Sequence, residues 1–175
     1  GIDLAIKKGA DAIFLLNQDT WIYENTITNL AEALFKNPNL GIVSPLHYSA
    51  DETTLDKNFN TYFNRFKKEE DSESLRIVPF INAASWLVSK DCFSKTGYFD
   101  PIFNHYGEDR NFCERVKFHG FKIGVVKNAA ICHDRIVKLN PNKIELQSKY
   151  LVLNQMINCN KSLFNSIFLG LKSVF

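Results

Sequence analysis

The segment from residue 10 to residue 47 constrains the fold of this 175-residue chain most strongly. A short apolar run, Ala10–Leu16, leads into a polar loop, and Glu24–Lys36 then places its apolar residues on one helical face. Asn37-Pro38 ends that helix, and Gly41–His47 is a second apolar run. The order strand, helix, strand predicts an α/β fold with a mostly parallel sheet, in which the first strand is buried on both faces.

The rest of the chain continues this alternation. Residues 1–9 are typical of a helix that is already under way and ends at Gly9. A polar loop is expected at 49–74, with one short helix around 59–66. Further elements are expected as strands at 75–80, 83–89 and 121–126, and as helices at 91–96, from Glu108 to its closing Gly120, and from 142 onwards. We divide the chain into a domain at 1–140 and a helical extension at 141–175.

The last helix is strongly apolar along one side. Packing of this face against the core is the expected role, and a helix on a membrane surface or against a partner is the alternative. The residues concerned are Leu163, Phe164, Ile167, Phe168, Leu171, Val174 and Phe175.

Composition excludes several classes of protein. A hydrophobic content of 45% is enough for one buried core, and a net charge of +2 without a basic stripe argues against a nucleic-acid partner. No stretch approaches the ~20 apolar residues that span a bilayer. The four cysteines have neither zinc-site spacing nor a disulfide framework, so reduced thiols in a cytoplasmic protein are expected.

Two adjacent carboxylates, Glu108 and Asp109, follow Gly107 at the start of a helix that closes at Gly120. Acidic residues in a first helical turn can simply complement the helix dipole. A carboxylate fixed on a rigid element can also take a proton from a hydroxyl. Both roles are compatible with the motif alone.

Two further groups of polar residues also lie at the end of a predicted element. Asn17-Gln18-Asp19 follows the first apolar strand, and His133 lies near the distal end of the last one. Ligands of open α/β sheets gather beyond the carboxyl ends of the strands. The three sites therefore predict one ligand-binding edge.

The ordered motifs of residues 1–135 resemble the inverting family 2 glycosyltransferases of the GT-A fold, in particular their rhamnosyltransferase-like branch. The matching motifs are GIDLAI with GAD, FLLNQDT, NAASWLVS, GYFD, YGED and CER, together with His133. The resemblance implies transfer of a sugar, with rhamnose as the candidate, from a nucleotide-diphosphate donor that is dTDP- or UDP-linked. The acceptor would be a saccharide or glycolipid in polysaccharide biosynthesis of the cell envelope.

The same resemblance assigns roles on the donor side. Asp19 corresponds to the metal-binding acid, and His133 to the histidine that completes the site for Mg²⁺ or Mn²⁺. Asn17, Gln18 and Asp19 would bind the donor diphosphate. Asn17 stands where the family has its first acid, so the loop supplies one formal negative charge.

On the acceptor side, the resemblance makes Asp109 the general base and Glu108 the group that positions the acceptor hydroxyls. Trp86 would stack on the acceptor sugar, or else belong to the core. We expect Arg115 to hold the helix in place through an ion pair rather than to contact substrate.

The strands that bind the nucleoside in that family have no counterpart here. The resemblance therefore implies the C-terminal two thirds of a GT-A domain, beginning at a fragment boundary and carrying an exposed sheet edge that invites self-association. The expected location is cytoplasmic, with peripheral contact on the inner face of the membrane left open. Two alternatives remain open: a catalytically silent binding or assembly fragment, and a glycoside hydrolase with paired carboxylates.

Overall fold

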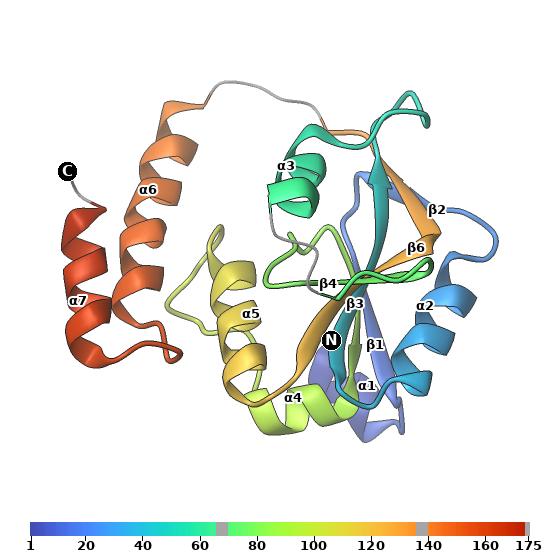
Figure 1. Cartoon of the computed structure of the whole chain (residues 1–175), viewed down its shortest axis with the longest axis horizontal. Coiled ribbons are helices and arrows are strands. Elements are labelled where there is room, and N and C mark those ends of the chain that lie inside the picture. Colours follow the sequence, from blue (N-terminus) through green and yellow to red (C-terminus); the bar gives the residue numbers. More distant parts are fainter. Residues whose placement is uncertain (66–69, 136–139, 174–175) are drawn as a thin grey trace.

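A computed structural model describes residues 1–65, 70–135 and 140–173 of the chain. Residues 66–69 of the predicted polar loop and residues 174 and 175 of the apolar tail lie outside the described residues. Within these ranges, six strands form one sheet with helices on both faces (Figure 1). The predicted α/β class is confirmed.

The predicted elements are present, with small shifts at their ends in all but the last strand. The helices are α1 (Ile2–Lys7), α2 (Thr26–Lys36), α3 (Lys57–Arg65), α4 (Lys90–Thr96), α5 (Glu108–Phe118), α6 (Pro141–Met156) and α7 (Leu163–Lys172). The strands are β1 (Ala12–Leu16), β2 (Thr20–Ile22), β3 (Leu40–Tyr48), β4 (Leu75–Val78), β5 (Ser85–Ser89) and β6 (Lys122–His133).

The strand order is β1-β5-β3-β6-β2, with β4 also paired to β6. Only β3 and β6 pair in parallel among the described strands, and the other pairs are antiparallel. The expectation of a mostly parallel sheet was therefore wrong. β1 and β3 do run in the same direction, as the βαβ pattern predicts, but β5 lies between them and pairs antiparallel to both.

The two faces of the sheet carry separate cores. Ile42 and Trp86 point into the core beneath α3, α4 and α5, whereas their neighbours Val43 and Leu87 point into the core beneath α2. The prediction that β1 is buried on both faces was wrong: its residues are half-buried to exposed, because among the described residues it pairs with β5 alone.

Strand β6 extends further than predicted. It continues unbroken for 12 residues to His133, and its distal end pairs with β2, which was not predicted. A three-residue strand is too short to show a hydrophobic period. This pairing places the end of β6 beside the loop that follows β1.

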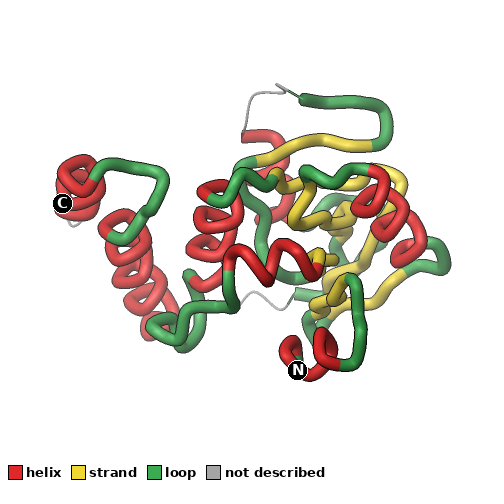
Figure 2. The backbone as a smooth tube through the Cα atoms, turned by 90° about the horizontal axis from the view of Figure 1, so that it is seen from below, coloured by secondary structure: helices red, strands yellow, loops and turns green. Residues whose placement is uncertain are grey.

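Helices α6 and α7 form a hairpin that packs mainly on itself, next to α5 at one end of the molecule (Figures 1 and 2). The prediction that the apolar face of α7 packs against the core was wrong, because its large apolar side chains are exposed. None of the helices in the described ranges is long and apolar enough to cross a bilayer. The division at residue 140 stays a prediction.

Candidate active site

Asp19 and His133 meet at the end of the sheet, although they are far apart in the sequence. Thr20 of β2 lies opposite His133 of β6, and the Asp134 amide donates to the Asp19 carbonyl at 3.0 Å. The Asp19 Oδ2 atom thereby lies 3.3 Å from His133 Nε2. The carboxylate is partly exposed, and the imidazole is buried.

The loop that carries Asp19 is held from both sides. The Asn17 amide donates to the Ala84 carbonyl at 2.9 Å, and the Thr20 hydroxyl donates to the Asn17 carbonyl at 2.6 Å. The side chains of Asn17, Gln18 and Asp19 are left facing solvent. The backbone is thus fixed while the polar side chains remain available to a ligand.

The Asp19 and His133 atoms have the spacing of two neighbouring ligands of one cation. Ligand atoms about 2.1 Å from an octahedral Mg²⁺ lie about 3.0 Å apart, close to the 3.3 Å observed here. No cluster of three or more His, Cys, Asp or Glu side chains suited to a metal occurs in the described ranges. The spacing of these two residues therefore fits two of the ligands of a divalent cation.

A second buried imidazole, His47, lies behind His133. The two rings meet edge to face with centroids 6.3 Å apart, and His47 stacks on Phe59 at 4.6 Å. Ser44 Oγ donates to the Ser85 carbonyl and lies 3.0 Å from His47 Nε2, which therefore carries the proton. Burial, with His133 and Arg135 nearby, lowers the pKa of His47 to about 3, so this ring is neutral.

Sequence reasoning did not single out His47, Ser44 or Arg135. The signal available was the presence of Ser44 and His47 in an otherwise apolar strand, where a buried polar side chain needs a partner. Arg135 lies just beyond His133, and its Nε is 3.8 Å from Asp56 Oδ2. Asp56 also accepts a hydrogen bond from the Phe59 amide at 2.8 Å. The Asp56 carboxylate therefore holds the Arg135 guanidinium near the end of β6.

The Glu108 and Asp109 carboxylates follow a segment of unusual backbone geometry at the start of α5. Tyr106 and Gly107 both have positive φ, 70° and 98°, and Gly107 is the N-cap of the helix. A non-glycine residue in this region is uncommon and frequently occurs at functional sites. Glu108 follows directly, and its Oε2 is buried without a hydrogen-bond partner in the part of the chain that the structure describes.

Asp109 is partly buried, and burial raises the pKa of its carboxyl. The Glu108 charge acts in the same direction, whereas the Arg110 amide, 2.7 Å from Oδ1, opposes it, as do the Arg110 charge and the Ala83 amide. A carboxylate with a raised pKa is a stronger base than an ordinary aspartate.

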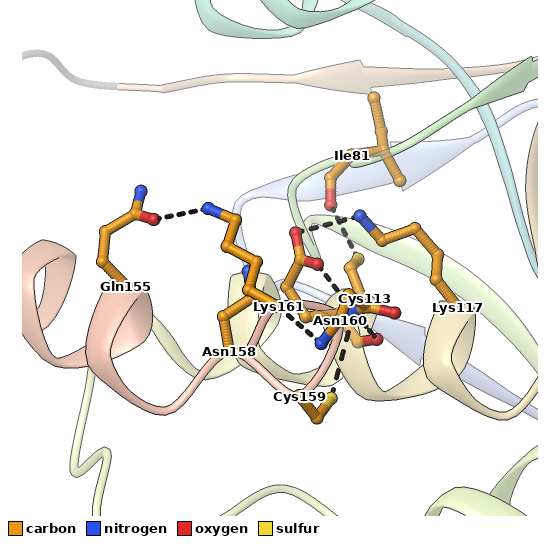
Figure 3. Close-up of polar contacts among 9 residues, drawn as sticks. Ile81, Cys113, Lys117, Gln155, Asn158, Cys159, Asn160 and Lys161 are labelled. Carbon is orange, nitrogen blue, oxygen red and sulfur yellow. Dashed lines mark hydrogen bonds and ion pairs between the residues drawn. The ribbon is translucent and has the colours of Figure 1, made fainter. Parts of the chain in front are cut away.

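Consecutive residues connect the two halves of the site. The Ala83 amide acts on Asp109, and the Ala84 carbonyl accepts from Asn17, so the entry to β5 runs between α5 and the Asp19 loop. Cys113 also donates to the Ile81 carbonyl, with the Sγ and O atoms 3.9 Å apart (Figure 3). The predicted sites are therefore assembled around one segment.

Two predicted roles need correction. Trp86 is fully buried and packs on Phe99 and Phe112 with ring centroids 6.4 and 6.1 Å away, so it is a core residue and presents no face for an acceptor sugar. Arg115 does hold α5 in place, but through carbonyls rather than an ion pair. It donates to the carbonyls of Thr96 and Tyr98, both at 2.6 Å.

A cavity of about 380 Å³ lies elsewhere, at the opposite end of β3 and β6. Its lining includes Leu40 and Lys122, the first residues of those strands, and none of the predicted site residues. It is separate from the polar site described above.

No protein-family model and no curated protein matches the chain. Among solved structures it is similar to a mannosyltransferase from Pyrobaculum calidifontis in complex with GDP-Man and Mn²⁺, with a TM-score of 0.63 at 12% identity. It is also similar to GalNAc-T7 with UDP, GalNAc and Mn²⁺, with a TM-score of 0.58 at 12% identity. These matches cover 96% and 89% of this chain.

The chain spans 46% of the mannosyltransferase chain and 34% of the GalNAc-T7 chain. At this identity the likeness concerns the arrangement of the backbone. The fold is the GT-A fold of these glycosyltransferases, as the motifs led us to expect, although its sheet is mixed rather than mostly parallel.

Proposed function

We propose that the protein is a glycosyltransferase, or the metal- and acceptor-binding part of one, that uses a nucleotide-diphosphate sugar. The observation that carries the proposal is the pairing of Asp19 with the buried His133 at the end of the sheet. The GT-A fold supports it, since the similar mannosyltransferase and GalNAc-T7 structures hold GDP-Man or UDP together with Mn²⁺.

On the donor side, Asp19 and His133 would hold Mg²⁺ or Mn²⁺, which when bound neutralises charge on the leaving diphosphate. Asn17 and Gln18 present amide side chains on the same loop for the diphosphate oxygens. Arg135 adds a positive charge at the end of β6. Asp19 is the only carboxylate of this loop, so the cation would also need the phosphate oxygens of the donor.

On the acceptor side, the Asp109 carboxylate would take the proton from the attacking hydroxyl as its oxygen bonds to the anomeric carbon. The bond from that carbon to the diphosphate oxygen breaks at the same time, and the electron pair leaves with the diphosphate. Glu108, whose Oε2 is buried and unpartnered among the described residues, would accept a hydrogen bond from another acceptor hydroxyl.

The motif resemblance supports finer proposals. We infer an inverting reaction of the family 2 type, a dTDP- or UDP-linked donor with rhamnose as the candidate sugar, and a saccharide or glycolipid acceptor in the cell envelope. We also propose a cytoplasmic location, at the inner face of the membrane.

The cation site can be tested separately from transfer. We expect calorimetric titration of the chain with Mn²⁺, alone and with UDP, GDP or dTDP, to show cation binding. Asp19→Asn and His133→Ala should each weaken it by about tenfold or more, because each removes one of two protein ligands. Asp91→Asn, which changes an exposed aspartate on α4, should leave it unchanged.

Transfer is then measured with nucleotide-sugar donors and saccharide acceptors. Transfer that disappears in Asp19→Asn supports the proposal. Cation binding with no nucleotide binding and no transfer would favour the silent fragment. Cleavage of an oligosaccharide without a donor would favour the hydrolase and contradict the proposal.

A further inference from the structure

Helix α7 exposes its apolar side. Phe164 is 80% exposed and Phe168 59%, and they lie on one side of the helix with Leu163, Ile167 and Leu171, which are also exposed. We call these five side chains the α7 face. Scattered single apolar residues are normal on protein surfaces, whereas a contiguous face of this kind marks a contact site.

The packing of α7 explains why this face points outward. The helix turns its small residues toward α6: Ser166 and Gly170 are its buried residues. A Cβ atom at Gly170 would clash with Met156, and the Ser166 hydroxyl donates to the Asn158 carbonyl at 3.3 Å. Turning α7 to bury its large side chains would place them where the helices are too close to admit them.

Polar contacts fix the hairpin to the body of the protein. Asn160, in the turn between α6 and α7, donates to the carbonyl and to the carboxylate of Glu114 on α5, at 2.7 and 2.9 Å. Within the hairpin, Lys161 of the turn donates to Gln155 of α6 at 2.9 Å (Figure 3). Both backbone views place α7 on the far side of α6 from the sheet (Figures 1 and 2).

The charged residues near the α7 face indicate which kind of surface it contacts. Residues 146–175 contain three lysines, Lys149, Lys161 and Lys172, and no acidic residue. A symmetric contact between two copies would bring like charges together, which disfavours self-association through this face. Exposed apolar side chains bordered by lysines match the surface of an anionic bilayer.

We propose that α7 docks on an anionic lipid surface, with the α7 face inserted at the boundary between headgroups and acyl chains. Lys161 and Lys172, at the two ends of the helix, would lie at the level of the lipid phosphates. The proposal is independent of sugar transfer, because it uses none of the residues assigned to the reaction.

Vesicle sedimentation tests this docking. We expect the chain to bind phosphatidylcholine vesicles that contain phosphatidylglycerol about tenfold or more tightly than pure phosphatidylcholine vesicles, and high salt should weaken the binding. Phe168→Ser should lower the partition coefficient about tenfold. The matched control is Phe35→Ser on α2, because Phe35 has nearly the same exposure, 57%, and it should bind like the parent chain.

Circular dichroism would check that both variants keep the fold, as exposed substitutions should. Absence of binding to either vesicle overturns the proposal, and so does equal binding to both regardless of salt. Equal losses in Phe168→Ser and Phe35→Ser would show that α7 is not the docking element. A dimer detected by light scattering and dispersed by Phe168→Ser, without vesicle binding, would assign the face to a second copy.

Discussion

Burial of Asp109 has a structural cost, which can be measured separately from the chemical role proposed for this residue. Its carboxyl is partly buried beside the Glu108 charge, and burial raises its pKa above the ordinary value of 3.8. The folded protein therefore holds a proton on Asp109 more tightly than the unfolded chain does. Stability therefore falls as the pH rises from that ordinary value through the folded pKa.

We predict that Asp109→Asn loses activity and gains stability. Removing the base should lower transfer by about 10²–10⁴-fold. The thermal midpoint at pH 7 should rise, because the variant has no carboxyl whose ionisation burial opposes. The advantage over the parent chain should shrink as the pH falls toward 3.8, where both carry a neutral group. A transferase assay and thermal unfolding at several pH values measure both effects, and loss of stability together with activity would indicate a structural role instead.

At the scale of the element, the start of α5 depends on a glycine at a crowded place. Gly107 has a φ of 98°, and a Cβ there would lie 2.9 Å from the Tyr150 Cβ atom and 3.0 Å from Asn154 Nδ2. Its carbonyl also accepts from Asn154 at 3.0 Å. The first turn of α5, which carries both carboxylates, is therefore supported by α6.

A comparison of Gly107 with Gly120, which also has a positive φ, can distinguish the cost of backbone strain from the cost of side-chain crowding. Gly120, just beyond the end of α5, has a φ of 81°, and a Cβ atom added there would have no neighbour within 4 Å among the described residues. Gly120→Ala should cost about 1 kcal/mol through backbone strain alone. Gly107→Ala should cost a further ~1–3 kcal/mol from overpacking and should lower transfer. Urea unfolding measures the difference, and equal losses would contradict the role given to α6.

At the scale of the whole molecule, the hairpin and the sheet differ in how they are held. β6 is paired on both sides and buried for most of its length. In α6 the buried residues are Tyr150 and Asn154 alone, and Tyr150 packs on Phe103. Segments with few buried apolar contacts open at lower free energy than a protein's core.

We predict that amide hydrogens of 141–172 exchange faster than those of 122–133. Asn154→Ala should speed exchange in the hairpin further, because the Gly107 carbonyl loses a donor, while exchange in β6 stays the same. Hydrogen exchange followed by mass spectrometry resolves the two regions. Equal protection throughout would mean that hairpin and sheet unfold as one unit.

Much of the fold could be predicted from local patterns. The apolar stripe that includes Leu30 and Leu34 predicted α2, and the continuous apolar run predicted β3, because both patterns are set by neighbouring residues. The direction of β5 and the pairing of β2 could not be predicted this way. Strand order and direction depend on contacts between distant segments, which hydrophobic periodicity does not encode.

For the candidate site, the sequence by itself singled out the candidate side chains, Asp19, His133, Glu108 and Asp109, and the motif resemblance suggested their roles. The tertiary structure decided that Asp19 lies 3.3 Å from His133, that Trp86 is core and that the α7 face is exposed. The physical reason is the distance along the chain over which each kind of interaction acts. Residue type and local period act within one element, whereas distance, burial and exposure are set by the elements that pack around it.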